Sequence, residues 1–134
     1  MVCIYCGSNT SVSNSRFLKQ SNQVWRRRLC GKCQAIFTTK ESVELSGAVM
    51  VSKPRGDLIK FSRDHLFISI HESCKHRKGA IDDATALTQT IISKLSTGME
   101  KGVISISDIK IVTLSVLQNF DTTAAAVYTG LHPR

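Results

Sequence analysis

Four of the five cysteines form two pairs, Cys3 with Cys6 and Cys30 with Cys33. Each pair has two residues between its members, and a glycine follows or lies within each pair. Two Cys-x-x-C knuckles of this kind supply the four thiolates of a tetrahedral Zn²⁺ site, which leaves no open position, so the sequence predicts a structural metal. Disulfides, a redox pair and reduced cysteines that pack as small hydrophobes are the alternatives. The second, equally spaced pair favours zinc over all three.

Positive charge is concentrated in the same part of the chain. The formal net charge is +8, but residues 1–40 carry no Asp or Glu, whereas residues 41–134 are nearly neutral with eleven basic and ten acidic side chains. The basic residues of the first segment are Arg16, Lys19, Arg26, Arg27, Arg28, Lys32 and Lys40. Such asymmetry predicts a polyanionic partner.

The densest charge, Trp25 to Arg28, directly precedes the second cysteine pair. On a strand, Arg26 and Arg28 point one way, and Trp25 and Arg27 point the other. Guanidinium groups on a rigid hairpin suit phosphates and guanine edges, so nucleic acid is the predicted partner. A solvated basic strand is the alternative, and these residues do not distinguish DNA from RNA. Trp25 either covers a thin core or stacks on a base or sugar.

The elements that hold these residues are predicted to form an α+β protein. A small antiparallel zinc ribbon is expected over residues 1–45, because this polar segment cannot bury enough apolar area to fold alone. A mainly α-helical domain with an N-terminal β-hairpin is expected over residues 46–134. The chain has no apolar run of roughly 18 residues and no signal peptide, so cytosolic location and no membrane contact are expected.

In the second domain a hairpin is predicted between Val49 and Phe61, followed by about four helices. The predicted N-caps of these helices are Ser62, Asp82, Ser107 and Asp121. The predicted buried positions are Leu66, Ile70 and Cys74 on the first helix, Ala84, Leu87, Ile91 and Leu95 on the second, and Ile109, Val112 and Val116 on the third. Cys74 is expected to be ordinary core.

The stretches "CIYCGSNTSVSNSR", "WRRRLCGKCQAIFTTKE" and "VSKPRGDLIKFSRDHL" resemble the bacterial ribonucleotide-reductase repressor family, NrdR, which joins a zinc ribbon to an ATP-cone. The resemblance is specific over residues 1–41 and looser from 49 to about 128. It implies a repressor, not an enzyme, that binds double-stranded DNA upstream of ribonucleotide reductase genes. It further implies ATP or dATP as regulatory ligands, a homo-oligomer whose assembly they change, and a location in the bacterial cytosol, associated with the nucleoid.

The resemblance implies DNA contacts for Arg16, Arg26, Arg27 and Arg28 and a nucleotide contact for Lys53, and the charge and position of neighbouring residues extend both sets. The DNA-binding candidates are Arg16, Trp25, Arg26, Arg27, Arg28 and Lys32. The nucleotide-binding candidates are Val51, Lys53, Arg55, Lys60, Arg63 and His65.

Several positions depart from the family pattern. Trp25 replaces the first arginine of a quartet, Asn14 replaces an aspartate, and Pro54 and His65 stand where basic residues are expected. A neutral imidazole holds phosphate less strongly than lysine does. The alternative function is therefore a zinc-ribbon nucleic-acid-binding or interaction module whose cone has lost its ligand and only mediates oligomerisation. No Walker-type loop occurs, so hydrolysis is not expected.

Overall fold

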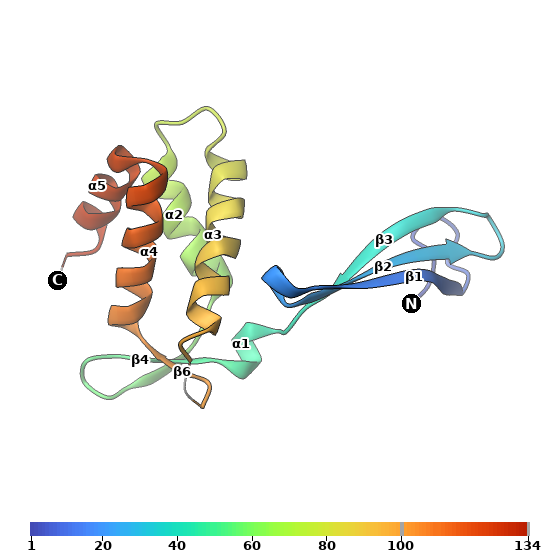
Figure 1. Cartoon of the computed structure of the whole chain (residues 1–134), viewed down its shortest axis with the longest axis horizontal. Helices are drawn as coiled ribbons and strands as arrows, with labels where there is room; N and C mark the ends of the chain where they lie inside the picture. The colour runs from blue at the N-terminus through green and yellow to red at the C-terminus, as the bar shows by residue number, and fades with distance from the viewer. Residues whose placement is uncertain (100, 134) are drawn as a thin grey trace. The chain divides into compact units, whose positions relative to one another are not determined.

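The computed structural model describes residues 1–99 and 101–133. The chain divides into two compact units, Met1–Val43 and Glu44–Arg134, which we call the ribbon unit and the helical unit (Figure 1). The predicted fold class is confirmed, since an antiparallel sheet with four clustered cysteines precedes a mainly helical part. Among the described residues, no helix is long and apolar enough to cross a membrane.

The ribbon unit is a three-stranded antiparallel sheet with strand order β1-β2-β3. Its elements are β1 (Thr10–Leu18), the 3₁₀ turn η1 (Lys19–Ser21), β2 (Gln23–Cys30) and β3 (Ile36–Glu41). Asn22 closes the connection between β1 and β2 with a φ of 48°, a left-handed conformation that asparagine tolerates. A bulge between Val12 and Asn14 interrupts the pairing of β1 with β2.

Very little apolar surface is buried inside the ribbon unit. The buried hydrophobic residues described there are Cys3 and Cys30, with exposed fractions of 2% and 0%. Large side chains such as Tyr5, Phe17 and Ile36 remain exposed. The sheet therefore has no ordinary hydrophobic core. The two cysteine knuckles must supply the stability that such a core would otherwise provide.

The helical unit places four long helices beside a small mixed sheet of order β5-β4-β6 (Figure 1). Its elements are α1 (Leu45–Ala48), β4 (Met50–Ser52), β5 (Leu58–Lys60), α2 (Arg63–Cys74), α3 (Ala80–Ser96), β6 (Val103–Ser105), α4 (Ile106–Phe120) and α5 (Thr122–Leu131). The predicted hairpin is present as β4 and β5. Sequence analysis missed β6, which pairs with β4 in parallel; just before β6, Gly102 O accepts from Met50 N at 2.8 Å.

Two of the four predicted helix caps are correct. Ser62 accepts a hydrogen bond from His65 N, and Asp121 accepts from the amides that begin α5. The predicted cap Asp82 is wrong, because α3 begins earlier, after Gly79, and places that carboxylate in its first turn, where it favours the helix dipole. The predicted cap Ser107 is also wrong, because Ser105 accepts from Asp108 N at 3.0 Å and caps α4.

The predicted core faces of α2 and α3 are confirmed, and Cys74 is fully buried among them. Burial raises the pKa of the Cys74 thiol, as expected for an inert core cysteine. The predicted face of α4 is only partly correct. Val116 is buried, but Ile109 and Val112 are half-buried, and the fully buried positions are Thr113 and Leu117.

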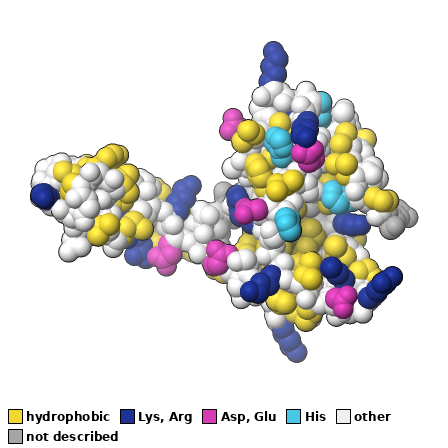
Figure 2. Space-filling view, turned by 180° about the vertical axis from the view of Figure 1, so that it is seen from behind, with side chains coloured by type: hydrophobic (Ala, Val, Ile, Leu, Met, Phe, Trp, Pro, Cys, Tyr) yellow, Lys and Arg dark blue, Asp and Glu magenta, His cyan; other side chains and the backbone are white. Residues whose placement is uncertain are grey.

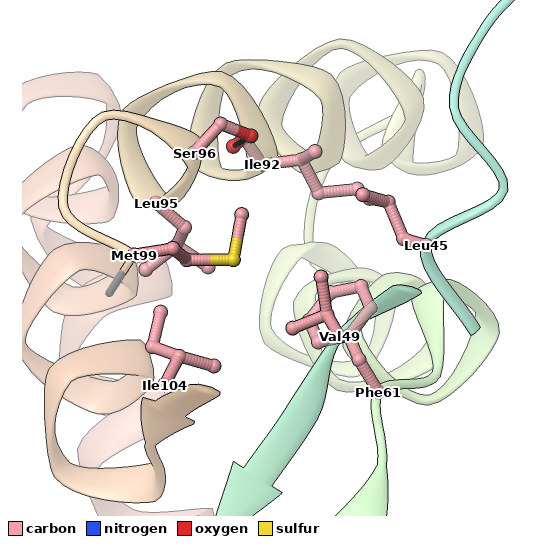
Figure 3. A pocket seen from close by; sticks show the side chains of 8 residues that line it. All are labelled: Leu45, Val49, Phe61, Ile92, Leu95, Ser96, Met99 and Ile104. Atoms are coloured by element: carbon pink, nitrogen blue, oxygen red, sulfur yellow. Dashed lines mark hydrogen bonds between the residues drawn. The ribbon is translucent and has the colours of Figure 1, made fainter. Parts of the chain in front are cut away.

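The hairpin packs against α3 around a small apolar cavity of about 10 Å³. Figure 3 shows Val49 and Phe61 of the hairpin region facing Ile92 and Leu95 of α3, with Leu45 of α1 beside them. Met99, Ser96 and Ile104 complete the lining. A cavity of this volume holds at most about one water molecule, so it is a packing gap rather than a ligand site.

A charged cluster joins the turn after α2 to the start of α5. The Asp121 carboxylate accepts from Arg77 Nη1 at 2.9 Å and lies 3.1 Å from His76 Nε2. Its other oxygen accepts from Thr123 N and Ala124 N at 2.8 and 3.0 Å. The Ala124 amide, His76, Arg77 and the Thr123 amide together hold the pKa of the Asp121 carboxyl well below its usual range.

Because the folded pKa of Asp121 is depressed, its stabilising effect is present above the unfolded carboxyl pKa of about 3.9 and is lost as pH falls below it. We expect Asp121→Ala to lower the free energy of unfolding by about 1–2 kcal/mol at neutral pH, the usual cost of losing a cap. Urea unfolding followed by circular dichroism measures this. The difference in free energy of unfolding between Asp121→Ala and the wild type should narrow below about pH 4. The control Asp57→Ala removes an exposed carboxylate between β4 and β5. A loss of stability in Asp121→Ala that is equal at neutral and acidic pH would contradict the electrostatic explanation.

Candidate metal centre and nucleic-acid interface

Two tight turns carry the four clustered cysteines. In the first, Gly7 N donates to Cys3 O at 3.0 Å, and Gly7 adopts a φ of 71° that favours glycine. In the second, at the end of β2, Gln34 N donates to Cys30 O at 3.0 Å and Gln34 has a φ of 58°. The two turns are closed by the same type of backbone bond, so each presents its sulfurs in the same way.

The sulfur geometry fits a tetrahedral ion. The ligand atoms of Cys3, Cys6, Cys30 and Cys33 all lie within 4.8 Å of one another. The Sγ–Sγ distances are 3.6 Å for Cys3–Cys33 and 3.5 Å for Cys6–Cys30. A tetrahedron with Zn–S bonds of about 2.3 Å has edges of about 3.8 Å, close to these values. The four cysteines can therefore hold a zinc ion.

The electrostatics of the cluster favour a bound cation. The Ser8 backbone amide, the Ser8 hydroxyl and Cys30 lower the pKa of the Cys6 thiol to about 6. The Ala35 amide favours the Cys33 thiolate, but desolvation and the nearby sulfurs outweigh it and raise the pKa of Cys33 to about 12. Without a cation, the thiols cannot all ionise at such short distances. A divalent ion removes this conflict, because metal-bound thiols are deprotonated.

The candidate DNA-binding side chains lie on opposite faces of the ribbon sheet. Residues directly opposite in neighbouring strands share a face, and Trp25 lies opposite Arg16 of β1 and Lys40 of β3. Arg27 follows on that face, two residues along β2. Arg26 lies on the other face with Thr39 and Ser15 opposite it.

Arg26 and Arg28 both have partners on β3. Arg26 Nη2 lies 2.9 Å from Glu41 Oε2, and Arg28 Nε donates to Thr39 Oγ1 at 3.1 Å. The sequence alone does not reveal this ion pair, because the register of β2 and β3 brings Glu41 to Arg26. The sixth candidate, Lys32, is exposed in the turn after Cys30 and lies on no strand.

The candidate nucleotide-binding residues are only partly brought together. A cavity of about 230 Å³ lies between the hairpin and helices α2, α4 and α5. Val51, Lys60 and His65 line this cavity, but Lys53, Arg55 and Arg63 do not. Lys53 and Arg55 lie at the exposed turn of the hairpin, and Arg63 is the first residue of α2.

Sequence analysis missed three further lining residues, Lys110, Tyr128 and His132. His132 stacks on Tyr128 with ring centroids 4.4 Å apart, and its two nitrogens lie 3.0 Å from Ser69 Oγ and from the Tyr128 carbonyl. Burial raises the pKa of the Tyr128 hydroxyl. No local pattern marks these residues, because only the packing of α5 against α2 and α4 brings them to the cavity.

The model of the family described as "Transcriptional repressor NrdR-like, N-terminal domain" matches residues 1–41. A protein of Hyphomonas neptunium named transcriptional repressor NrdR is 33% identical over 133 residues, which cover 98% of this chain and 82% of the relative. Proteins of the same name from Sinorhizobium medicae and Streptococcus pneumoniae are 32% and 35% identical, over 98% and 90% of this chain and 83% and 76% of their own lengths. These relatives are repressors by name and not enzymes. The similarity extends through both units, and the chain therefore belongs to the NrdR family.

Proposed function

We propose that this protein is a DNA-binding transcriptional repressor whose helical unit responds to ATP or dATP. Its targets would be ribonucleotide reductase genes, as in the family it belongs to, and its place would be the bacterial cytosol at the nucleoid. The observation that carries the proposal is the similarity to named NrdR repressors through both units. The ribbon unit binds DNA in this proposal, and the helical unit senses nucleotide and forms the oligomer.

Zinc has a structural role in this proposal. Cys3, Cys6, Cys30 and Cys33 would hold it with all four positions filled, so that it supplies rigidity and no chemistry. The ribbon unit buries almost no other apolar side chain, and metal binding therefore provides the free energy that orders it. Once ordered, the sheet holds the arginines of β2 at fixed spacing.

The ribbon unit also has the charge of a DNA-binding surface. Residues 1–40 carry seven basic side chains and no acidic ones. Phosphate contacts by such side chains release counterions, which gives duplex binding a steep dependence on salt. Family membership favours double-stranded DNA over RNA as the partner.

The lining of the cavity in the helical unit combines aliphatic and basic side chains, which suits part of a nucleotide. Its volume is about 230 Å³, and its aliphatic lining residues, which include Ile59, Ile106 and Ile109, suit a base or sugar. Lys60 and Lys110 also line it and can meet a phosphate group. Figure 2 shows further Lys and Arg side chains around the lower end of this unit, at the height of β4 and β6 in Figure 1.

A second candidate is a ribbon-based DNA- or protein-binding module whose helical unit only mediates assembly. His65 favours it, because the imidazole stands where a lysine is expected in the family pattern and is cationic only when protonated. Lys53, Arg55 and Arg63, which sequence analysis also proposed for the phosphates, do not line the cavity.

Fluorescence anisotropy of a labelled DNA duplex, titrated with the whole protein, tests the proposal. We expect the association constant to fall steeply as salt rises, and to change when ATP or dATP is added. Isothermal calorimetry and light scattering then report nucleotide binding and assembly. Lys60→Ala should weaken nucleotide binding roughly tenfold, while the control Lys94→Ala, on α3 and away from the cavity lining, should not. Salt-dependent duplex binding with no heat from either nucleotide would favour the second candidate.

A further inference from the structure

The basic side chains of the ribbon sheet are divided between its two faces. We infer that double-stranded DNA binds one of them, which we call the open face and define by Arg16, Trp25, Arg27 and Lys40. This inference rests on the proposed function. It differs from the sequence-based assignment, because Arg26 and Arg28 become residues that position the strands rather than DNA contacts.

The strand register places the open face without ambiguity. Arg16, Trp25 and Lys40 are direct partners across β1, β2 and β3, so they form one row. Arg27 belongs to the neighbouring row on the same face, between Asn14 and Thr38. Direct neighbours in such rows lie about 5 Å apart, so Arg16 and Lys40 are about 10 Å apart across Trp25, and both can reach phosphates of one duplex.

Burial distinguishes the two faces in the same way. Arg16, Arg27 and Lys40 are exposed, whereas Arg26 and Arg28 are only half-exposed. Arg26 Nε is buried without a partner among the described residues. Arg26 and Arg28 would have to give up their contacts with Glu41 and Thr39 to reach a duplex, whereas Arg27 has no such side-chain contact among the described residues.

The second face also lacks the charge that a duplex requires. Glu41 lies on it, opposite Val24, and its carboxylate pairs with Arg26 at 2.9 Å. Arg28 donates to Thr39 across the sheet. DNA binding there would break the Arg26 ion pair and bring a carboxylate towards phosphates. The four residues that define the open face include three cations and no acid.

Trp25 gives the open face an apolar centre. It lies between Arg16 and Lys40 in the row that crosses the sheet and is half-buried. An indole in this position can pack against a deoxyribose while the flanking cations hold the neighbouring phosphates. The arginine that the family pattern has here would add charge, whereas Trp25 adds contact area.

The neighbouring residues Arg27 and Arg28 provide a matched pair of variants. Arg27→Gln and Arg28→Gln remove the same charge from the same strand on opposite faces. We expect Arg27→Gln to weaken binding to a labelled mixed-sequence duplex about tenfold at moderate salt and to lower the salt slope by about 1. Arg28→Gln should leave the slope unchanged. Circular dichroism and zinc content check that both variants fold.

Trp25 is the only tryptophan, so its fluorescence reports on the open face alone. Saturating duplex should protect Trp25 from acrylamide quenching in the wild type and in Arg28→Gln. The inference would be overturned if Arg27→Gln and Arg28→Gln lowered the salt slope equally. It would also be overturned if duplex left the quenching of Trp25 unchanged while anisotropy reported binding. Either result would leave DNA binding itself intact. No anisotropy change at low salt would instead overturn the proposed function, and the inference with it.

Discussion

Removing zinc with a chelator is expected to unfold the ribbon unit and to abolish duplex binding, while the helical unit keeps its circular dichroism. Structural zinc supplies about 10–16 kcal/mol in small domains, far more than a three-stranded sheet with two buried cysteines can replace. The Trp25 emission should shift to longer wavelength as the sheet opens. Adding Zn²⁺ back should restore both the emission and the binding.

A pair of cysteine variants makes this test specific. Cys6→Ser removes one sulfur of the cluster, and Cys74→Ala removes the fifth cysteine, which lies in the core of the helical unit. Zinc measured with a colorimetric chelator should be one ion per chain in the wild type and in Cys74→Ala, and absent or loosely held in Cys6→Ser. A wild-type protein without stoichiometric zinc, or full duplex binding after the metal is removed, would contradict the role given to the cluster.

The parts of the structure that sequence analysis predicted correctly depend on short-range patterns. The cysteine cluster follows from two Cys-x-x-C spacings, and the core faces of α2 and α3 follow from helical periodicity. Ser62 and Asp121 are correct caps because each directly precedes a helix with a clear start. Asp82 fails because α3 begins after Gly79 without a side-chain cap, and Ser107 fails because Ser105, two positions earlier, caps α4 instead.

The missed features depend on contacts between distant segments. Strand β6 has three residues and exists only because it pairs with β4, about 50 positions earlier. His132 reaches the cavity only because α5 packs beside α2 and brings it to Ser69. The separation of Arg26 and Arg27 follows from strand alternation, but the pairing with Glu41 depends on the register of β2 and β3. No local pattern contains these pairings.

Truncating Ile91 at the centre of the helical unit is expected to have the second largest effect. Ile91 is fully buried on α3, and Ile91→Ala leaves a cavity there that costs about 2–5 kcal/mol. Urea unfolding followed by circular dichroism should show this loss of stability as an earlier unfolding transition of the helical unit. The matched control Ile111→Ala removes the same atoms from a side chain on α4 that is 66% exposed, and should change stability by less than about 0.5 kcal/mol.

The same variant tests whether the two units fold independently, as the predicted domains at residues 1–45 and 46–134 require. The boundary between the units lies between Val43 and Glu44 in the chain. The ribbon unit has four cysteines that can hold a metal ion, and the helical unit has an aliphatic core. Ile91→Ala should therefore leave zinc content and Trp25 emission unchanged at urea concentrations that unfold its helices. If Trp25 emission shifted together with the helical transition, the ribbon would depend on the helical unit for its fold. In the proposed function, nucleotide binding would then act on DNA affinity through the stability of the ribbon unit as well as through assembly.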